Sequence, residues 1–194
     1  DAIVVFIGPC ASKKLEAMRR TVRSDVDFVL TFEELDAMFD AREIDPASFE
    51  EDGSLHDATA AGRGYAVAGG VAGAIEACLK EYYPDVPVHI EHAESLAECK
   101  KVLALAKAGK LKGCMIEGMA CPGGCAGGGG QPIHDGLELA CQRGQKLYAL
   151  DKGSQLRFSH ENPAIVQAYD KFLDRPLSHK SHELLHSRQA EWDL

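Results

Sequence analysis

The chain has no apolar run long enough to span a bilayer, and it does not begin with a recognisable secretory signal. It also lacks an excess of basic residues, because 21 lysines and arginines stand against 30 acidic residues, for a formal net charge of −9. This charge argues against a nucleic-acid or anionic-membrane surface. We therefore expect a soluble globular protein of 194 residues, as one sizeable domain or two small lobes, with no nucleic-acid or membrane partner.

Seven cysteines occur without an export signal. Disulfides are rare in reducing compartments, where thiols stay available for metal, so we expect a cytoplasmic protein with unpaired cysteines. After Asp1 the chain passes at once into the apolar run Ala2-Ile3-Val4-Val5-Phe6-Ile7, which has the character of a buried strand. A mature protein rarely begins inside its sheet core, so we also expect this chain to be a fragment of a larger one.

The most informative stretch runs from Gly118 to Pro132 and reads G-M-A-C-P-G-G-C-A-G-G-G-G-Q-P. It places Cys121 and Cys125 in a loop that has six glycines after Met119. Glycine lets the backbone turn sharply and bring its N–H groups close to a bulky, electron-rich group. Thiolates are soft ligands that select iron–sulfur clusters, zinc or copper(I). These residues therefore predict a metal cluster seated in a glycine-rich cradle.

The hydrophobic pattern alternates strands and helices up to this loop and is helical after it. Strands are expected at residues 2–7, 25–30, 86–90 and 113–120, and helices at about residues 70–82, 93–107, 137–151, 163–173 and 179–189. Thr31 and Glu34 form a capping box that predicts one further helix. We predict an α/β fold, a parallel sheet flanked by helices with a helical C-terminal segment. An α/β lobe would span residues 1–134 and a helical tail residues 135–194.

Cys10 follows the first expected strand, with Lys13 and Lys14 close behind it. Nearby positive charge lowers the pKa of a thiol and so favours the thiolate, which is the form that binds metal. Two lysines also fit an ordinary solvated helix face. Cys10, Cys121 and Cys125 all come just after expected strands, and ligands bind at that edge of open α/β sheets. We therefore predict that these three sulfurs converge on one metal site.

Three thiolates are one short of a four-cysteine cluster. The other cysteines lie on apolar helix faces or, in one case, at the start of a strand: Cys78, Cys99, Cys141 and Cys114. Buried cysteine commonly serves as a small hydrophobic residue, so we expect all four to be structural. The fourth ligand is then expected upstream of Asp1.

Other motifs are weaker. The segment from His182 to His186 reads H-E-L-L-H and matches the helix of zinc proteases. Such a site needs a third ligand, for which only Glu191 remains, so we favour a surface helix packed through its leucines. The glycine run is not a P-loop because no G-K-[ST] follows it, and the glycines near residue 62 lack the dinucleotide spacing.

Taken together, these segments resemble the catalytic domain of the iron-only (FeFe) hydrogenases. The family signature M-P-C-x-x-K-x-x-E is similar to Gly8 through Glu16, and E-x-M-A-C-x-x-G-C-x-x-G-G-G-Q-P is similar to Glu117 through Pro132 without a gap. Shorter similar pieces run through most of the chain, including the closing S-H-E-L-L-H. The resemblance explains that last motif as a family tail rather than a zinc site.

The resemblance implies a [4Fe–4S] cubane joined through one cysteine sulfur to a diiron subcluster, together called the H-cluster. Cys10, Cys121 and Cys125 would be cubane ligands, and Cys125 would also bridge to the diiron unit. Lys13 would hydrogen-bond a cyanide ligand of the diiron unit, and Pro9 and Met119 would line its pocket. Upstream ferredoxin-like cluster domains or a ferredoxin would supply electrons, and protons or hydrogen would be the substrate.

This sequence departs from the family pattern in several places. The first signature, T-S-C-C-P, does not occur in it, and Gly8 stands where a methionine is usual. Two readings therefore remain open. The first is a fragment of a hydrogenase, inactive by itself, and the second is a hydrogenase-like iron–sulfur protein with a sensory or cluster-assembly role.

Overall fold

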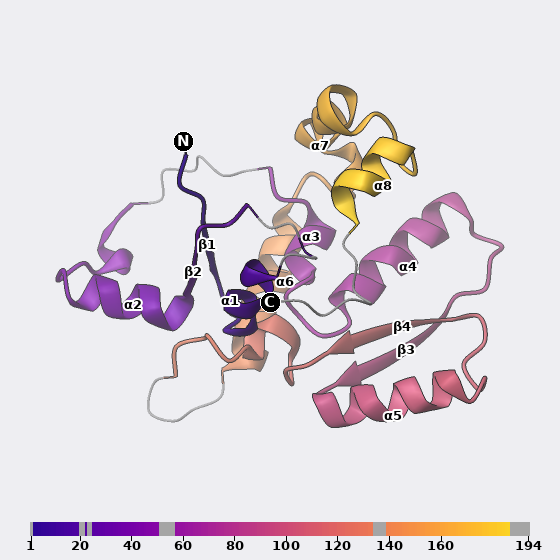
Figure 1. Cartoon of the computed structure of the whole chain (residues 1–194), viewed down its shortest axis with the longest axis horizontal. Coiled ribbons are helices and arrows are strands. Elements are labelled where there is room, and N and C mark those ends of the chain that lie inside the picture. The colour runs from indigo at the N-terminus through magenta and orange to yellow at the C-terminus, as the bar shows by residue number, and fades with distance from the viewer. Residues whose placement is uncertain (1, 20–21, 23–24, 51–56, 134–138, 187–194) are drawn as a thin grey trace. The chain divides into compact units, whose positions relative to one another are not determined.

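The computed structural model describes residues 2–19, 22, 25–50, 57–133 and 139–186. The chain divides into two compact units, each built from stretches that are separated in the sequence. The first unit takes residues 1–54, 129–132 and 163–194, and the second takes residues 55–128 and 133–162. Figure 1 shows the course of the chain through its helices and strands.

The first unit contains a pair of parallel strands. Strand β1 (Val5–Gly8) pairs with β2 (Phe28–Thr31), in a register that sets Gly8 opposite Thr31. Helix α1 (Ser12–Met18) follows β1, and helix α2 (Phe32–Asp40) follows β2 directly. The capping box expected from the sequence is present: Thr31 Oγ1 accepts from the Glu34 N–H at 3.2 Å, and the Glu34 carboxylate accepts from the Thr31 N–H at 2.8 Å.

The first unit also contains the C-terminal helices. A short 3₁₀ turn, η2, spans Pro46–Ser48. Helix α7 (Pro163–Ala168) continues into a π-helical turn, η5 (Tyr169–Leu173), and α8 spans His179–Leu185. The Ser178 side chain caps α8 by accepting from the Ser181 N–H at 3.1 Å. The helical C-terminal segment predicted from the sequence is therefore present, and the end expected at residue 189 lies outside the described residues.

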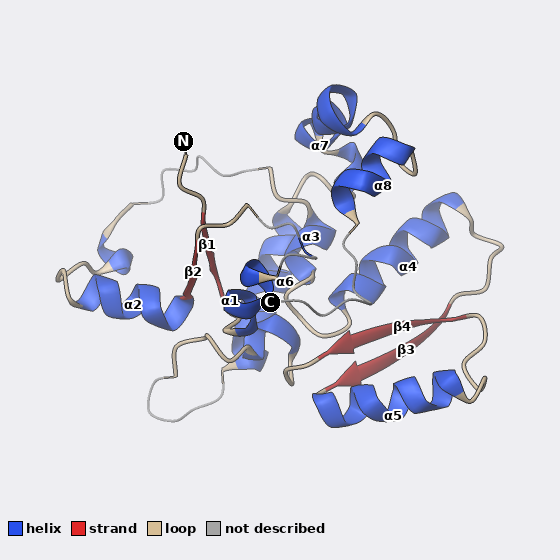
Figure 2. Ribbon diagram, in the orientation of Figure 1, coloured by secondary structure: helices blue, strands red, loops and turns tan. Residues whose placement is uncertain are grey.

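The second unit is organised around the other strand pair. Strand β3 (His89–Glu94) pairs in parallel with β4 (Cys114–Met119), and α5 (Leu96–Lys107) connects them. Figure 2 shows α4 (Gly70–Tyr82) and α5 on either side of this strand pair. The unit also contains α3 (Ala60–Gly64), the 3₁₀ turns η3 (Gly124–Gly127) and η4 (Ser159–Glu161), and α6 (Ala140–Gly153).

Small residues allow the helices of the second unit to approach closely. A Cβ added at Gly70, where α4 begins, would lie 1.8 Å from the carbonyl oxygen of Gly64 at the end of α3. The buried apolar residues among those described are alanines from α3, α4, β3, η3 and α6: Ala60, Ala72, Ala74, Ala93, Ala126 and Ala140. Interhelical contact therefore depends on short side chains, and many large apolar side chains stay partly exposed.

The predicted fold class is confirmed, because the structure is an α/β arrangement of parallel strands and helices. The strands form two separate pairs in the described residues, whereas the sequence predicted a single sheet. The short helix α3 is not among the helices that the sequence predicted. The division at residue 134 stays a prediction, and that residue lies outside the described residues. In the described part of the chain, no helix combines the length and apolarity needed to cross a bilayer.

Candidate functional site

The Cys121–Cys125 loop begins where strand β4 ends. Met119 is the last residue of β4, and Cys121 follows in a turn that is closed by the Gly124 N–H donating to the Cys121 carbonyl at 3.0 Å. Cys125 lies in η3, and its carbonyl accepts from the Gly128 N–H at 3.0 Å. Cys121 is half-buried and Cys125 is exposed. The strand therefore delivers two thiols on a short, internally hydrogen-bonded loop.

Two glycines make this loop possible. Gly123 and Gly124 have φ angles of +78° and +74°, in the left-handed region that side chains with a Cβ rarely adopt. A Cβ at Gly124 would lie 2.5 Å from the Ala68 nitrogen and 2.9 Å from the Ala66 oxygen. The Ala126 N–H also donates to the Ala66 carbonyl at 2.8 Å. The loop is therefore docked against residues 66–68 through a close backbone approach that only glycine allows.

The carboxyl end of β4 is also held by the start of α5. The Met119 carbonyl accepts from the Ser95 N–H at 2.8 Å, and the Cys99 thiol lies 3.7 Å from the same oxygen. Ser95 has a φ of 92° and a ψ of 153°, a conformation that is strained for any residue except glycine. Met119, which was predicted to line the diiron pocket, is thus held through its backbone.

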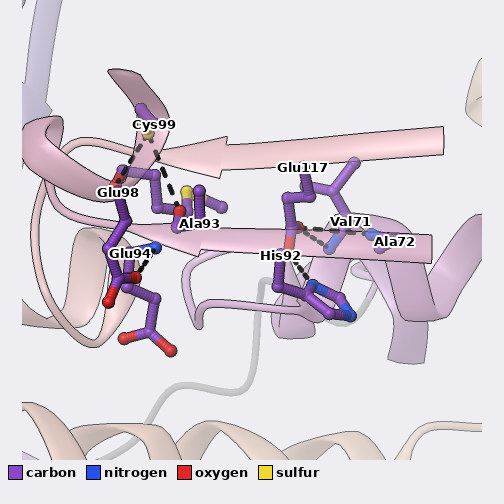
Figure 3. Close-up of polar contacts among 9 residues, drawn as sticks. Val71, Ala72, His92, Ala93, Glu94, Glu98, Cys99 and Glu117 are labelled. Carbon is purple, nitrogen blue, oxygen red and sulfur yellow. Dashed lines mark hydrogen bonds and ion pairs between the residues drawn. The ribbon is translucent and has the colours of Figure 1, made fainter. Parts of the chain in front are cut away.

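Glu117, the first residue of the signature that ends at Pro132, has a role that the sequence did not reveal. Its side chain is 6% exposed, on strand β4. One oxygen accepts from the Val71 N–H at 3.0 Å and the Ala72 N–H at 3.3 Å, and the other lies 3.1 Å from Nδ1 of His92 (Figure 3). The carboxylate therefore accepts from N–H groups in the first turn of α4 that have no partner within the helix, and its negative charge complements the positive end of the helix dipole. The signal in the sequence was an acidic residue within an otherwise apolar strand.

Pro9 and Cys10 lie in the first unit, immediately after β1. The Pro9 carbonyl accepts from the Gly130 N–H at 2.9 Å, and the Gly130 carbonyl accepts from the Glu33 N–H at 3.0 Å. A Cβ at Gly130 would lie 2.7 Å from the Thr31 side chain. The half-buried Cys10 is therefore next to a residue that is fixed by Gly130, and Gly130 lies in the stretch 129–132 of the same unit.

The two lysines of α1 have different partners. Lys13 forms an ion pair with Glu16, one turn along the helix, and its side chain is 43% exposed. Lys14 donates to the Val29 carbonyl of β2 at 2.9 Å and to the Glu34 carboxylate at 2.8 Å. Lys14 therefore ties α1 to β2 and α2, which gives it a structural role that the sequence did not reveal.

The structure describes the surroundings of the remaining cysteines. Burial raises the pKa of the Cys78 thiol, and the nearby Glu161 carboxylate raises it further, so Cys78 favours the protonated form. Cys99 has two backbone carbonyls within hydrogen-bonding range of sulfur, those of Ala93 and Met119. These surroundings are consistent with structural roles for Cys78 and Cys99, whereas Cys141 is exposed on α6 (Ala140–Gly153). Structural roles remain predictions for all four cysteines.

The H-E-L-L-H segment begins within α8. The rings of His182 and His186 are in edge-to-face contact, with centroids 4.5 Å apart, and both residues are exposed. Glu191, the third ligand that a zinc site would need, lies outside the described residues. Considering each unit by itself, the described residues contain no group of three or more His, Cys, Asp or Glu side chains that could hold a metal ion.

The donor set of the Cys121–Cys125 loop fits an iron–sulfur group. Two thiols four positions apart lie on a loop that is held by left-handed glycines, and Cys10 supplies a third thiol at the end of β1. None of the seven cysteines, all of which are described, is in a disulfide. Soft sulfur donors on glycine-rich backbone are the ligands that such clusters take. The convergence of Cys10, Cys121 and Cys125, and their ligand roles, stay predictions.

Comparison with known protein families gives two matches. Residues 1–129 match the family described as the iron only hydrogenase large subunit, C-terminal domain. Residues 137–188 match the iron hydrogenase small subunit. The second match covers most of residues 135–194, which the sequence predicted to be a helical tail.

Curated relatives include several hydrogenases. The chain is 38% identical over 95% of its length to the NADP-reducing hydrogenase subunit HndD of Solidesulfovibrio fructosivorans, and 28% identical over 96% to iron hydrogenase 1 of Clostridium pasteurianum. It spans 37% and 39% of the lengths of these two proteins. Over 75% of its length it is also 32% identical to the periplasmic [Fe] hydrogenase large subunit of Nitratidesulfovibrio vulgaris.

Solved structures agree with these matches. The [FeFe]-hydrogenase HydA1 from Chlamydomonas reinhardtii, in one variant form, superposes with a TM-score of 0.65 at 30% identity, over 96% of this chain and 62% of that one. A HydA structure described as a step in H-cluster assembly gives a TM-score of 0.67 at 28% identity. The family matches, the identities and the shared fold lead to one conclusion: the chain belongs to the iron-only hydrogenase family, as a C-terminal part of the large-subunit domain.

Proposed function

We propose that this chain forms the C-terminal part of the catalytic domain of an FeFe hydrogenase, which interconverts protons plus electrons and hydrogen (2H⁺ + 2e⁻ ⇌ H₂). The observation that carries the proposal is the Cys121–Cys125 loop. The signature E-x-M-A-C-x-x-G-C-x-x-G-G-G-Q-P is complete in it, and Gly123 and Gly124 take left-handed angles that allow close backbone approach at Gly124. A loop built in this way presents two soft ligands on a fixed backbone, which suits a bulky cluster.

The cysteines would hold the metal centre. Cys10, Cys121 and Cys125 would bind a [4Fe–4S] cubane as thiolates, and Cys125, whose side chain is exposed, would bridge to a diiron subcluster. When bound, this H-cluster supplies the site at which protons and electrons combine. The part played by the protein is to hold the centre in one orientation and to limit the access of water.

Three other residues would complete the pocket. Lys13 would donate to a cyanide ligand of the diiron unit, where an ammonium group stabilises negative charge. Its present partner, Glu16, lies on the same exposed helix face, so an exchange of partner costs little because surface ion pairs contribute about 0–1 kcal/mol. Pro9 and Met119, both held through backbone hydrogen bonds, would line the pocket.

The isolated chain would hold an incomplete centre, because T-S-C-C-P does not occur in it. In the family that signature provides the fourth cubane ligand and a cysteine that passes protons. We therefore propose that the chain acts together with a segment carrying this signature, and that ferredoxin-like cluster domains or a ferredoxin exchange electrons with it. We propose a cytoplasmic location on the basis of seven cysteines outside any disulfide.

The test is hydrogen evolution by the chain joined to a segment that carries T-S-C-C-P and matured anaerobically. We expect reversible hydrogen turnover, which Cys125→Ala should abolish and Cys141→Ala, at an exposed cysteine of α6, should retain. Unchanged turnover in Cys125→Ala would remove this residue as the bridge. The chain alone, purified in air, should contain much less iron than a complete H-cluster needs.

A second function is favoured by other relatives. The chain is 26% identical over 95% of its length to a probable cytosolic Fe–S cluster assembly factor of Dictyostelium discoideum, and 28% identical over 58% to the bovine cytosolic iron-sulfur assembly component 3. In this alternative the cysteines would bind an iron–sulfur cluster with no diiron unit and no hydrogen turnover, in a sensory or assembly role. Infrared bands of iron-bound carbon monoxide and cyanide after maturation would favour the hydrogenase, and a cluster without them would favour the alternative.

A further inference from the structure

A carboxylate from the neighbouring strand contacts the cysteine loop. Oε2 of Glu94 accepts a hydrogen bond from the backbone N–H of Gly123 at 2.8 Å. Gly123 lies between Cys121 and Cys125 and has a φ of +78°. All four residues belong to the second unit. The contact therefore joins the last residue of β3 to the middle of the loop that carries both thiols.

The backbone of Glu94 is fixed on both sides. Glu94 lies opposite Met119 in the register of β3 and β4, and its own N–H donates to the Glu98 carboxylate at 2.9 Å (Figure 3). The next residue, Ser95, donates its N–H to the Met119 carbonyl at 2.8 Å in a strained conformation. Although the Glu94 side chain is exposed, it thus extends from a backbone that is held by two hydrogen bonds, one at Glu94 and one at Ser95.

A hydrogen bond at this place has two consequences for a cluster on Cys121 and Cys125. Backbone N–H groups that donate to cluster sulfur, and positive charge nearby, raise the reduction potential of an iron–sulfur centre. Glu94 accepts the hydrogen bond of the Gly123 N–H, so this N–H does not donate to cluster sulfur. Glu94 also places a negative charge beside the loop that carries the ligands. Both effects oppose the addition of an electron to a centre held there.

We propose that Glu94 is a positioning residue for the cysteine loop: it fixes the loop through the Gly123 amide and makes an iron–sulfur centre bound to Cys121 and Cys125 harder to reduce. The first part depends only on the contact in the chain itself. The second part depends on the proposed function, because it requires the centre to be bound. Two measurements separate these parts.

The first measurement is hydrogen exchange at the Gly123 amide in the full chain. Glu94→Ala removes the acceptor, so we expect exchange about tenfold faster than in the unsubstituted chain. Glu94→Gln keeps a carbonyl acceptor of the same shape, and exchange should remain close to the original rate. Glu91→Gln, at an exposed carboxylate on the same strand, is the matched control and should change nothing. Equal exchange rates in all four proteins would overturn the positioning role.

The second measurement uses the same proteins reconstituted anaerobically with ferrous iron and sulfide. A redox titration followed by electron paramagnetic resonance gives the reduction potential. We expect a more positive potential in Glu94→Gln, which removes only the charge, and in Glu94→Ala, with no shift in Glu91→Gln. If the potential is the same in Glu94→Gln, Glu94→Ala and the unsubstituted protein, the electrostatic role is wrong. If no cluster forms in the unsubstituted chain, the electrostatic part of the proposal fails. The proposed function is then still decided by hydrogen turnover in the chain joined to a T-S-C-C-P segment, and the positioning role by the exchange data.

Discussion

Nδ1 of His92 lies 3.1 Å from Oε2 of Glu117, and the two residues are direct partners across strands β3 and β4. The other oxygen of this carboxylate accepts from two N–H groups of α4, those of Val71 and Ala72. One buried side chain thus connects two strands and a helix. Since β4 continues into the Cys121 loop, the same carboxylate also supports the structure from which the candidate ligands extend.

Loss of this carboxylate should destabilise the second unit. Glu117→Ala leaves two backbone donors and the His92 ring without their partner, and we expect a loss of about 2–3 kcal/mol in the free energy of unfolding. Glu117→Gln retains an acceptor for α4 and should cost less, about 1 kcal/mol. Urea unfolding followed by circular dichroism measures both. Equal costs for the two variants would show that the negative charge, rather than the hydrogen bonds to α4, carries the effect.

Gly124 should not tolerate a side chain. Gly124→Ala forces a left-handed φ on a residue with a Cβ and places that atom against residues 66–68, so we expect a loss of at least about 2 kcal/mol. The cysteine loop should also undock, which hydrogen exchange at the Ala126 amide would detect. Gly129→Ala is the matched control, since a Cβ there meets nothing within 4 Å, and its stability should change by less than about 0.5 kcal/mol.

Ser95 combines backbone strain with a cap for α5. Its side chain accepts from the Glu98 N–H at 3.4 Å, while its φ of 92° suits only glycine. Ser95→Gly relieves the strain and loses little capping, so we expect the protein to gain about 1 kcal/mol of stability. Ser95→Ala loses the cap and keeps the strain, which should cost about 1 kcal/mol. Thermal unfolding of both variants checks the opposite signs, and a destabilised Ser95→Gly would contradict the argument.

The Glu34 ion pair should make the first unit sensitive to acid. The hydrogen bond from Lys14, followed by that from the Thr31 backbone, lowers the pKa of the Glu34 carboxyl in the folded protein. Its contribution to stability is therefore present above the pKa of the unfolded chain and is lost as the pH falls through the lowered value. We expect Glu34→Gln to be less stable than the unsubstituted protein at neutral pH and equally stable in strong acid. Urea midpoints over a pH series test this, and a difference that persists unchanged in acid would contradict it.

The cysteine ligands can be tested without hydrogenase activity. After anaerobic reconstitution with ferrous iron and sulfide, Cys121→Ala and Cys125→Ala should each lose most of the bound iron, because both thiolates of one loop are needed to hold a cluster. Cys141→Ala, at another exposed cysteine, should bind as much iron as the unsubstituted chain. Iron and sulfide analysis gives the comparison. Full iron binding in Cys121→Ala would exclude that residue from the ligand set.

Features that depend on local sequence were predicted well. The capping box at Thr31 and the start of α4 after Gly69 follow from the conformational preferences of two or three neighbouring residues. The signature loop was found for the same reason, since its cysteines and glycines are contiguous. The family resemblance identified from these segments is confirmed by the comparisons.

Features that depend on distant partners were not predicted. The hydrophobic pattern of the sequence is the same whether the four strands form one sheet or two pairs, because the burial of a strand does not specify which strand lies beside it. The contact between Glu94 and Gly123 joins residues 29 apart in sequence, and neither residue type indicates the other. The same is true of Lys14, which looks like a solvated lysine until the strand and helix that it contacts are known.

The interleaving of the two units affects how the chain can fold during synthesis. The segment at residues 129–132, which donates to Pro9 and accepts from Glu33, emerges from the ribosome long after β1 and β2. The first unit therefore cannot be complete until residues 129–132 have been translated, and these residues follow most of the second unit. A nascent chain stalled before residue 129 would leave the neighbourhood of Cys10 without the hydrogen bonds that Gly130 makes to Pro9 and Glu33. If Cys10 is a cluster ligand, as proposed, we therefore expect the metal centre to be assembled only after these residues have been synthesised.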